Sequence, residues 1–248
     1  MARVVTFNGR QSSDPALGIK IFHRVYRQIL PGTRDRLLTI PGRDGAYDQG
    51  RDLEQLIIPC EFVLQTTSPA ELRQRARAVA AWLNVRDAKE LIFSDEPDLH
   101  YLARPTGPVD IEQIIGIGIV KMSFLVPAGY AEAITATTVN GSSGNYPGTL
   151  PAPTIITLTA AAGDSLTVAQ DQYSAPKPFI RLLDQEFAGG ETVVIDTEKR
   201  LVTVNGADAR PGVDIDSDFE NFRLLPGAFA IGAEGGVIEN IVYRARYI

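Results

Sequence analysis

The sequence contains almost no cysteine or histidine: its 248 residues include one cysteine, Cys60, and two histidines, His23 and His100. A single cysteine cannot form an internal disulfide or a thiolate metal site, and two histidines are too few for a histidine-based metal centre. The phosphate-binding loop, the Gly-x-Ser-x-Gly elbow and the His-Glu-x-x-His motif are also missing. We therefore expect no cofactor and no enzymatic activity, and we predict that Cys60 is a buried structural thiol.

Long apolar runs are also lacking. No run approaches the roughly 18 to 20 residues that a membrane-spanning helix needs. The first residues, Met-Ala-Arg-Val-Val-Thr-Phe, do not form the apolar core of a signal peptide and look like the start of a strand. We expect a protein that folds in the cytosol where it is made and does not insert into a membrane.

Charge is unevenly distributed along the chain, whose formal net charge is −6. Residues 1–130 hold 16 basic and 15 acidic side chains, whereas residues 131–248 hold 8 and 15. A change of balance near the middle predicts two units with different surfaces. An acidic second half is a poor binder of phosphate backbones, so the sequence predicts no specific nucleic-acid binding.

The stretch 37–64 contains the clearest strand pattern. A short apolar run stops at the turn Ile40-Pro41-Gly42-Arg43-Asp44-Gly45, because proline fixes φ and glycine allows positive φ. Residues 56–64 then alternate with period two, which predicts a strand with one buried face. Pro59 cannot donate a ladder hydrogen bond and therefore predicts an edge position or a bulge. An unpaired edge invites another chain, which is the first indication of an assembly protein.

One helix is predicted near residues 69–85. Ser68 can cap it, Pro69 suits its first position, and Glu71 completes a capping box. Apolar residues recur at helical spacing after this start, and short strands precede and follow. Residues 1–130 are therefore expected to form an α+β domain, a sheet or barrel-like structure with one helix packed on it.

The second half is predicted to be all β. Residues 131–153 are rich in Thr, Ser, Gly, Asn and Pro and are interpreted as a connector. Residues 154–248 show short strands with turn residues about every ten positions, among them a hairpin over 192–205, and no helix signal. We expect this part to be an antiparallel β-sandwich, which makes the whole chain mainly β with two domains.

Three groups of residues are candidates for ligand binding. Asp214, Asp216 and Asp218 have the first, third and fifth spacing of a calcium loop, but the sixth-position glycine and twelfth-position glutamate are missing, so a solvated loop is the alternative. Tyr146 and Tyr173 could stack on a sugar, although core or surface tyrosines are commoner. His100 follows an acidic turn closely, so a carboxylate–histidine site is conceivable, but a solvated acidic turn leading into a strand explains the residues better.

The basic residues of the predicted helix form the sequence's one concentration of positive charge. They include Arg73, Arg75 and Arg77 and are expected on the solvent side. The functional alternative is contact with an acidic neighbour in an adjacent subunit, for which Asp95, Glu96 and Asp98 are candidates. The subunit-contact hypothesis therefore names three arginines and the acidic turn.

Several short motifs together resemble one family. They are Phe7-Asn8-Gly9, the turn Pro41-Gly42-Arg43-Asp44-Gly45, the helix end Trp82-Leu83 followed by 91–98 and Tyr101, Leu224-Leu225-Pro226-Gly227, and 243–247. In this order they span nearly the whole chain. They resemble the distal tail protein (Dit) family of siphovirus-type bacteriophages, which have long non-contractile tails.

The resemblance implies a structural protein of the virion tail tip, a baseplate hub made in the host bacterial cytoplasm. It implies a ring-forming domain at 1–130, a connector at 131–153 and a galectin-like β-sandwich at 154–248. It further implies a homo-hexameric ring that joins the tail tube to tip or receptor-binding proteins and leaves a channel for DNA.

Two other function classes remain open from the residues. The first alternative is a carbohydrate-binding adhesion module that contacts the host surface. The galectin sugar site depends on tryptophan and histidine, and neither occurs after residue 100, so host-glycan binding has no support in the sequence. The second alternative is a hydrolase, because any two of the 30 acidic residues could form a carboxylate pair, but no pair stands out.

Overall fold

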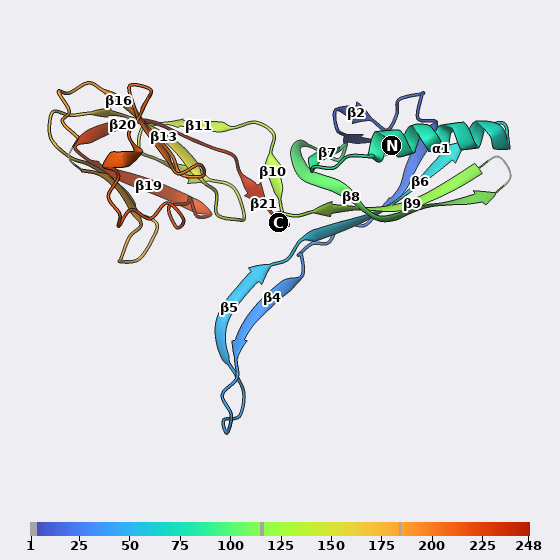
Figure 1. The fold of residues 1–248 in the computed structure, drawn as a ribbon, viewed down its shortest axis with the longest axis horizontal. Helices are drawn as coiled ribbons and strands as arrows, with labels where there is room; N and C mark the ends of the chain where they lie inside the picture. The colour runs from blue at the N-terminus through green and yellow to red at the C-terminus, as the bar shows by residue number, and fades with distance from the viewer. Residues whose placement is uncertain (1–3, 115–116, 184) are drawn as a thin grey trace. The chain divides into compact units, whose positions relative to one another are not determined.

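The computed structural model describes residues 4–114, 117–183 and 185–248. The chain divides into two compact units, Met1–Glu132 with Ile248, and Ala133–Tyr247. It is mainly β, as predicted, and its sheets are antiparallel (Figure 1). In the described residues, no helix combines the length and hydropathy that crossing a membrane would need.

The first unit is built on one long sheet with a helix packed against it. Its sheet order is β2-β1-β7-β8-β9-β6-β3, and β4 and β5 pair separately. The elements are β1 (Val5–Phe7), β2 (Arg10–Gln11), β3 (Ile19–Val25), β4 (Thr33–Leu38), β5 (Tyr47–Leu53), β6 (Leu56–Gln65), α1 (Pro69–Leu83), β7 (Lys89–Phe93), β8 (Glu96–Ile114), β9 (Ile117–Val126) and β10 (Ala131–Ala133).

The predicted helix is confirmed as α1, which ends at Leu83. The Ser68 hydroxyl accepts a hydrogen bond from the Glu71 amide at 3.2 Å. The Glu71 carboxylate accepts from the Thr67 amide rather than from that of Ser68. The indole Nε1 of Trp82 donates to the Phe7 carbonyl at 3.0 Å and so ties the helix to β1.

The alternating strand is also confirmed, but the edge position predicted from Pro59 is wrong. Apolar residues of β6 point into the core, and Cys60 is buried among them. Strand β6 lies between β9 and β3 rather than at an edge. The Pro59 carbonyl accepts from the Tyr26 amide, which follows the last residue of β3. In an antiparallel strand the backbone N and C=O of one residue face the same neighbouring strand. The Pro59 nitrogen therefore faces the β3 side at a point where β3 has already ended, so its missing N–H costs no ladder hydrogen bond there.

The second unit is a sandwich of a six-stranded sheet, β11-β20-β13-β16-β17-β18, and a four-stranded sheet, β12-β19-β14-β15. Buried side chains from both sheets form one core. The elements are β11 (Thr137–Asn140), β12 (Ser143–Tyr146), β13 (Thr154–Ala160), β14 (Leu166–Gln170), β15 (Phe179–Leu182), β16 (Thr192–Asp196), β17 (Leu201–Val204), β18 (Ala207–Asp208), η1 (Arg210–Gly212), β19 (Gly227–Glu234), β20 (Gly236–Tyr243) and β21 (Arg246–Tyr247).

Two strands of this sandwich lie in the segment interpreted as a connector, 131–153. Strand β11 pairs with β20, and β12 pairs with β19. Thr suits a pleated surface when a neighbouring strand supplies the hydrogen bonds, and local composition cannot reveal that neighbour. The segment therefore contributes an outer strand to each of the two sheets, instead of only linking two domains.

Candidate functional site

The most exposed part of the first unit is the hairpin formed by β4, β5 and the turn between them, residues 33–53, called here the arm. Every residue from Arg34 to Arg51 is exposed. The arm forms its own two-stranded sheet and extends away from the long sheet of its unit (Figure 1). An isolated two-stranded hairpin is marginally stable in water, so this element requires local support or a partner.

Local support comes from turn geometry and charge pairs. Gly42 and Gly45 have φ values of 83° and 80°, which only glycine adopts without strain. The Arg36 guanidinium binds the Asp52 carboxylate with two nitrogens, across the two strands. This hydrogen bonding lowers the pKa of Asp52 from its usual value. The Arg43 guanidinium lies 3.9 Å from the centroid of the Tyr47 ring.

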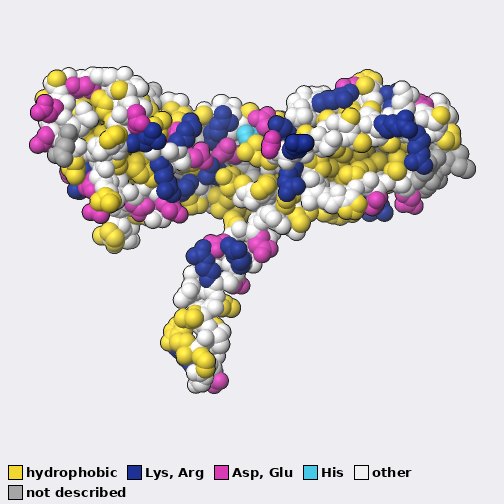
Figure 2. Space-filling view, viewed as in Figure 1, with side chains coloured by type: hydrophobic (Ala, Val, Ile, Leu, Met, Phe, Trp, Pro, Cys, Tyr) yellow, Lys and Arg dark blue, Asp and Glu magenta, His cyan; other side chains and the backbone are white. Residues whose placement is uncertain are grey.

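Apolar side chains occupy the outer part of the arm without being covered. Leu37, Leu38, Ile40 and Tyr47 are between 43% and 61% exposed. Figure 2 shows hydrophobic side chains gathered toward the end of the arm. Several neighbouring exposed apolar residues on one element mark an interaction surface, whereas single scattered ones do not. The arm is therefore a candidate assembly element.

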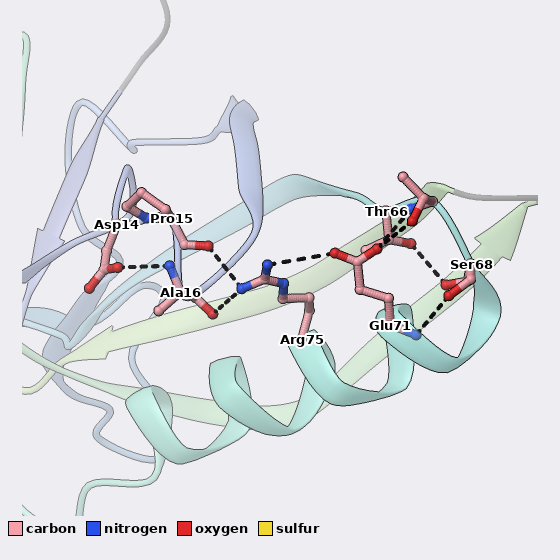
Figure 3. Close-up of polar contacts among 8 residues, drawn as sticks. Asp14, Pro15, Ala16, Thr66, Ser68, Glu71 and Arg75 are labelled. Atoms are coloured by element: carbon pink, nitrogen blue, oxygen red, sulfur yellow. Dashed lines mark hydrogen bonds and ion pairs between the residues drawn. The ribbon is translucent and has the colours of Figure 1, made fainter.

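The three arginines of the subunit-contact hypothesis differ in their surroundings. Arg75 donates to the carbonyl oxygens of Pro15 and Ala16, at 2.9 Å each, and forms an ion pair with Glu71 at 3.6 Å (Figure 3). It ties the loop before β3 to the helix. Arg73 and Arg77 are exposed and form no ion pair with the described residues. Of the three arginines, Arg73 and Arg77 are therefore the ones whose charge is not paired with a described residue.

The acidic turn is also used largely within its own chain. Arg27 binds the carboxylates of both Asp95 and Glu96 and lies over the Phe93 ring, 5.1 Å from its centroid. Asp98 is exposed. The nearby His100 is buried, and its Nδ1 has no hydrogen-bond partner among the described residues. The helix arginines and the acidic turn are not brought together in one chain, and their contact between subunits stays a prediction.

The aspartate loop forms hydrogen bonds of its own. Asp214 accepts from the Asp216 amide at 3.1 Å and from Arg181 at 3.3 Å. Asp218 accepts from the amide of Asn221, which lowers the pKa of that carboxyl. Across the described ranges, no group of three or more His, Cys, Asp or Glu side chains is placed to hold a metal ion. The hydrogen bonds within the loop explain why the aspartates occur at this spacing.

The two candidate sugar-stacking tyrosines have structural surroundings. Tyr146 is 1% exposed; its hydroxyl donates to the Leu150 carbonyl at 2.7 Å and accepts from the Arg246 amide at 2.9 Å. A ring at that depth cannot stack on a sugar. The Tyr173 hydroxyl donates to the Arg223 carbonyl at 3.2 Å. Burial raises the pKa of both phenols.

The sequence interpretation missed the second strand of the arm. Residues 47–53, Tyr-Asp-Gln-Gly-Arg-Asp-Leu, are mostly polar and include a glycine, which argues locally against a strand. A detectable signal was present in the charges, because Arg34 and Arg36 lie before the turn and Asp52 lies opposite them after it. Cross-strand ion pairs of this kind indicate a hairpin.

Two family models match the chain and together cover most of it. A phage tail protein RIFT-related domain matches residues 16–126. The C-terminal domain of a siphovirus-type tail component matches residues 147–247. The two matches follow each other without overlap, one in each compact unit.

Comparison with individual proteins agrees with these models. The distal tail protein of Bacillus phage SPP1 is 27% identical over 218 residues, which are 86% of this chain and 84% of that protein. A crystal structure of SPP1 Dit, described as a hub of the adsorption apparatus in phages that infect Gram-positive bacteria, matches with a TM-score of 0.80. The match covers 100% of both chains at 17% identity, which establishes a shared fold.

Proposed function

The chain belongs to the distal tail protein (Dit) family of siphovirus-type bacteriophages, whose members are structural tail-hub proteins, and from this premise we propose that it assembles into a homo-hexameric ring at the tail tip. The ring joins the tail tube to baseplate, tip or receptor-binding proteins. Its central channel lets DNA pass without binding it specifically. The first domain, 1–130, forms the ring, and the sandwich faces outward and docks other tip proteins.

The exposed arm is the observation that carries this proposal. An element that leaves apolar side chains in water on a marginally stable hairpin gains free energy when a neighbour covers it. A contact between an arm and a different surface of the next copy is heterologous, and such contacts close into rings when the rotation allows. The number six comes from the family and not from the arm.

The solution mass of the full-length protein tests assembly. We expect light scattering on a sizing column to give six times the chain mass of 26.9 kDa, with closed rings in negative-stain images of the peak. A dimer, or an open filament at every concentration, would contradict a closed six-membered ring. A monomer that bound glycans would favour the adhesion-module alternative.

Charge reversal on the helix tests the subunit-contact part of the proposal, for which Arg73, Arg77 and Asp98 are the exposed candidates. We expect Arg77→Glu to shift the oligomer toward smaller species at constant stability, because exposed substitutions usually change stability by less than about 0.5 kcal/mol. Arg75→Ala should instead lower the free energy of unfolding by about 1 kcal/mol, through the lost bonds to Pro15 and Ala16.

Light scattering and urea denaturation of both variants separate these effects. Unchanged oligomer size in Arg77→Glu would remove the support for a contact between the helix arginines and the acidic turn of an adjacent subunit. The ring proposal would then rest on the arm alone.

A further inference from the structure

A shallow apolar groove lies between helix α1 and strands β6, β8 and β9 of the first unit. Its cavity volume is about 250 Å³. Its lining includes Leu64, Ala76, Ala80, Asn84, Val109 and Ile111. Figure 2 shows hydrophobic side chains gathered between the helix and the strands on this face of the unit. We call this feature the helix groove.

An irregularity in β8 gives the groove part of its wall. Thr106 pairs with Ser123 and Asp110 with Lys121, so β8 advances four residues while β9 advances two. The two extra residues form a bulge at Gly107–Val109, whose Gly107 has a φ of 69°. Val109 lines the groove and is nearly half exposed, so this wall is apolar and open to solvent.

The lining argues against a small-molecule ligand. Ligand pockets usually have volumes of roughly 300 to 1,000 Å³ and a few converging polar groups. This groove is smaller, and Asn84 is the one polar side chain among its lining residues. Apolar side chains from a protein surface fit such a lining, because they need no hydrogen bonds.

The arm of the same chain is not in position to fill the groove. The arm enters β6 at Leu56, whereas the groove lies at Leu64, eight residues and about 27 Å farther along the strand. Helix α1 covers one side of the sheet, and the arm extends from the other side (Figure 1). One chain thus carries an uncovered apolar projection and an uncovered apolar groove in separate places.

We propose that the helix groove of one copy receives the apolar end of the arm of a second copy. Leu38, Ile40 and Tyr47 supply the side chains that enter. This inference rests on the proposed assembly and names the two surfaces that meet in it. Because the two surfaces differ, the contact is heterologous, as a ring requires.

The end of the arm carries two aspartates against one arginine, Arg43, which stacks on Tyr47, whereas the helix side of the groove is basic. Arg73 and Arg77 each lie three residues before a lining residue of the helix, so they border the groove as neighbours on the helix surface. Asp44 and Asp48 flank the end of the arm and form no ion pair with the described residues. The fit pairs aspartates of the arm with arginines at the groove's edge.

Disulfide trapping in the full-length chain tests the proposed pairing. Cys60 is buried and therefore not accessible for disulfide formation, so the mixed disulfides come from the introduced cysteines. Ile40→Cys and Ala80→Cys are made as separate chains with different tags and mixed under oxidising conditions. The matched control replaces Ala80→Cys with Ala81→Cys, since Ala81 is also exposed but does not line the groove. We expect about tenfold more mixed disulfide with Ala80→Cys, because adjacent helix positions point about 100° apart and a disulfide requires the two Cβ atoms to face each other.

Filling the groove is the second measurement. We expect Ala80→Trp to abolish assembly at an unchanged melting temperature and Ala81→Trp to assemble normally. Intact oligomers with no preference for Ala80→Cys would overturn the arm-in-groove contact and leave the hexamer proposal standing. Monomers without any mixed disulfide, even at the highest attainable concentration, would overturn both.

Discussion

Replacing Leu38 and Ile40 of the arm by aspartate is expected to reduce the assembled protein to monomers. Both side chains are substantially exposed in the single chain, so the change should cost the monomer less than about 0.5 kcal/mol. Burying such a side chain from full exposure contributes about 1.5 to 3 kcal/mol; these two are 46% and 43% exposed, so each can contribute about half of that in an assembly. Since about 1.4 kcal/mol is a factor of ten, the lost burial of the two side chains alone should weaken each subunit contact at least about tenfold.

Light scattering of the double variant against the unmodified chain gives the comparison, with urea denaturation as the check on folding. Thr39→Asp serves as the matched control, because it places one new carboxylate between the same two positions and removes no large apolar side chain. Assembly that survives the double substitution would show that the arm's apolar end is not part of the subunit contact. Equal disruption by Thr39→Asp would point to charge rather than apolar burial.

The largest stability effect is expected at Tyr146, the tyrosine that the sequence offered as a sugar-stacking candidate. Its ring packs edge-to-face on Tyr243, with centroids 5.2 Å apart, in the core of the sandwich. We expect Tyr146→Ala to lower the free energy of unfolding by about 3 to 5 kcal/mol, as large-to-small changes at buried aromatic positions do. Tyr146→Phe should cost about 1 to 3 kcal/mol, because the Leu150 carbonyl and the Arg246 amide both lose their partner.

Tyr173→Phe is the control for this prediction, since its hydroxyl makes a single hydrogen bond, to the Arg223 carbonyl. Urea midpoints of the three variants give the comparison. If Tyr146→Phe lowered the free energy of unfolding no more than Tyr173→Phe, the two hydrogen bonds of the Tyr146 hydroxyl would not stabilise the sandwich. The neighbouring Gly148 agrees with a structural role, because a side chain there would collide with the Tyr146 hydroxyl.

Elements whose signals are local could be predicted from the sequence. Helix α1 starts with three residues that each suit their positions, and β6 alternates over its length. The turn at Asn8-Gly9 has positive φ at both residues, as its dipeptide predicts, and Phe7 pairs with Arg10 across it. In each case the physical cause lies within a few residues, so reading along the chain is sufficient.

Elements whose stability comes from distant partners could not be predicted in the same way. Strand β11 is a Thr-rich segment that becomes a strand because β20, about a hundred residues later, pairs with it. Arg75 looked like a free surface charge, but its acceptors are carbonyl oxygens about 60 residues earlier. The helix groove has no sequence signal, because its lining comes from four elements that meet only in the fold.

The position of the single tryptophan makes the two units separable in spectroscopy. Trp82 is buried in the first unit and held to Phe7, and the second half of the chain has no tryptophan. Indole fluorescence therefore reports the state of the first unit alone, whereas circular dichroism reports both. Where the two transitions coincide, the chain unfolds as one cooperative system; where they diverge, each unit has its own stability, and variants in the sandwich move only the dichroism curve.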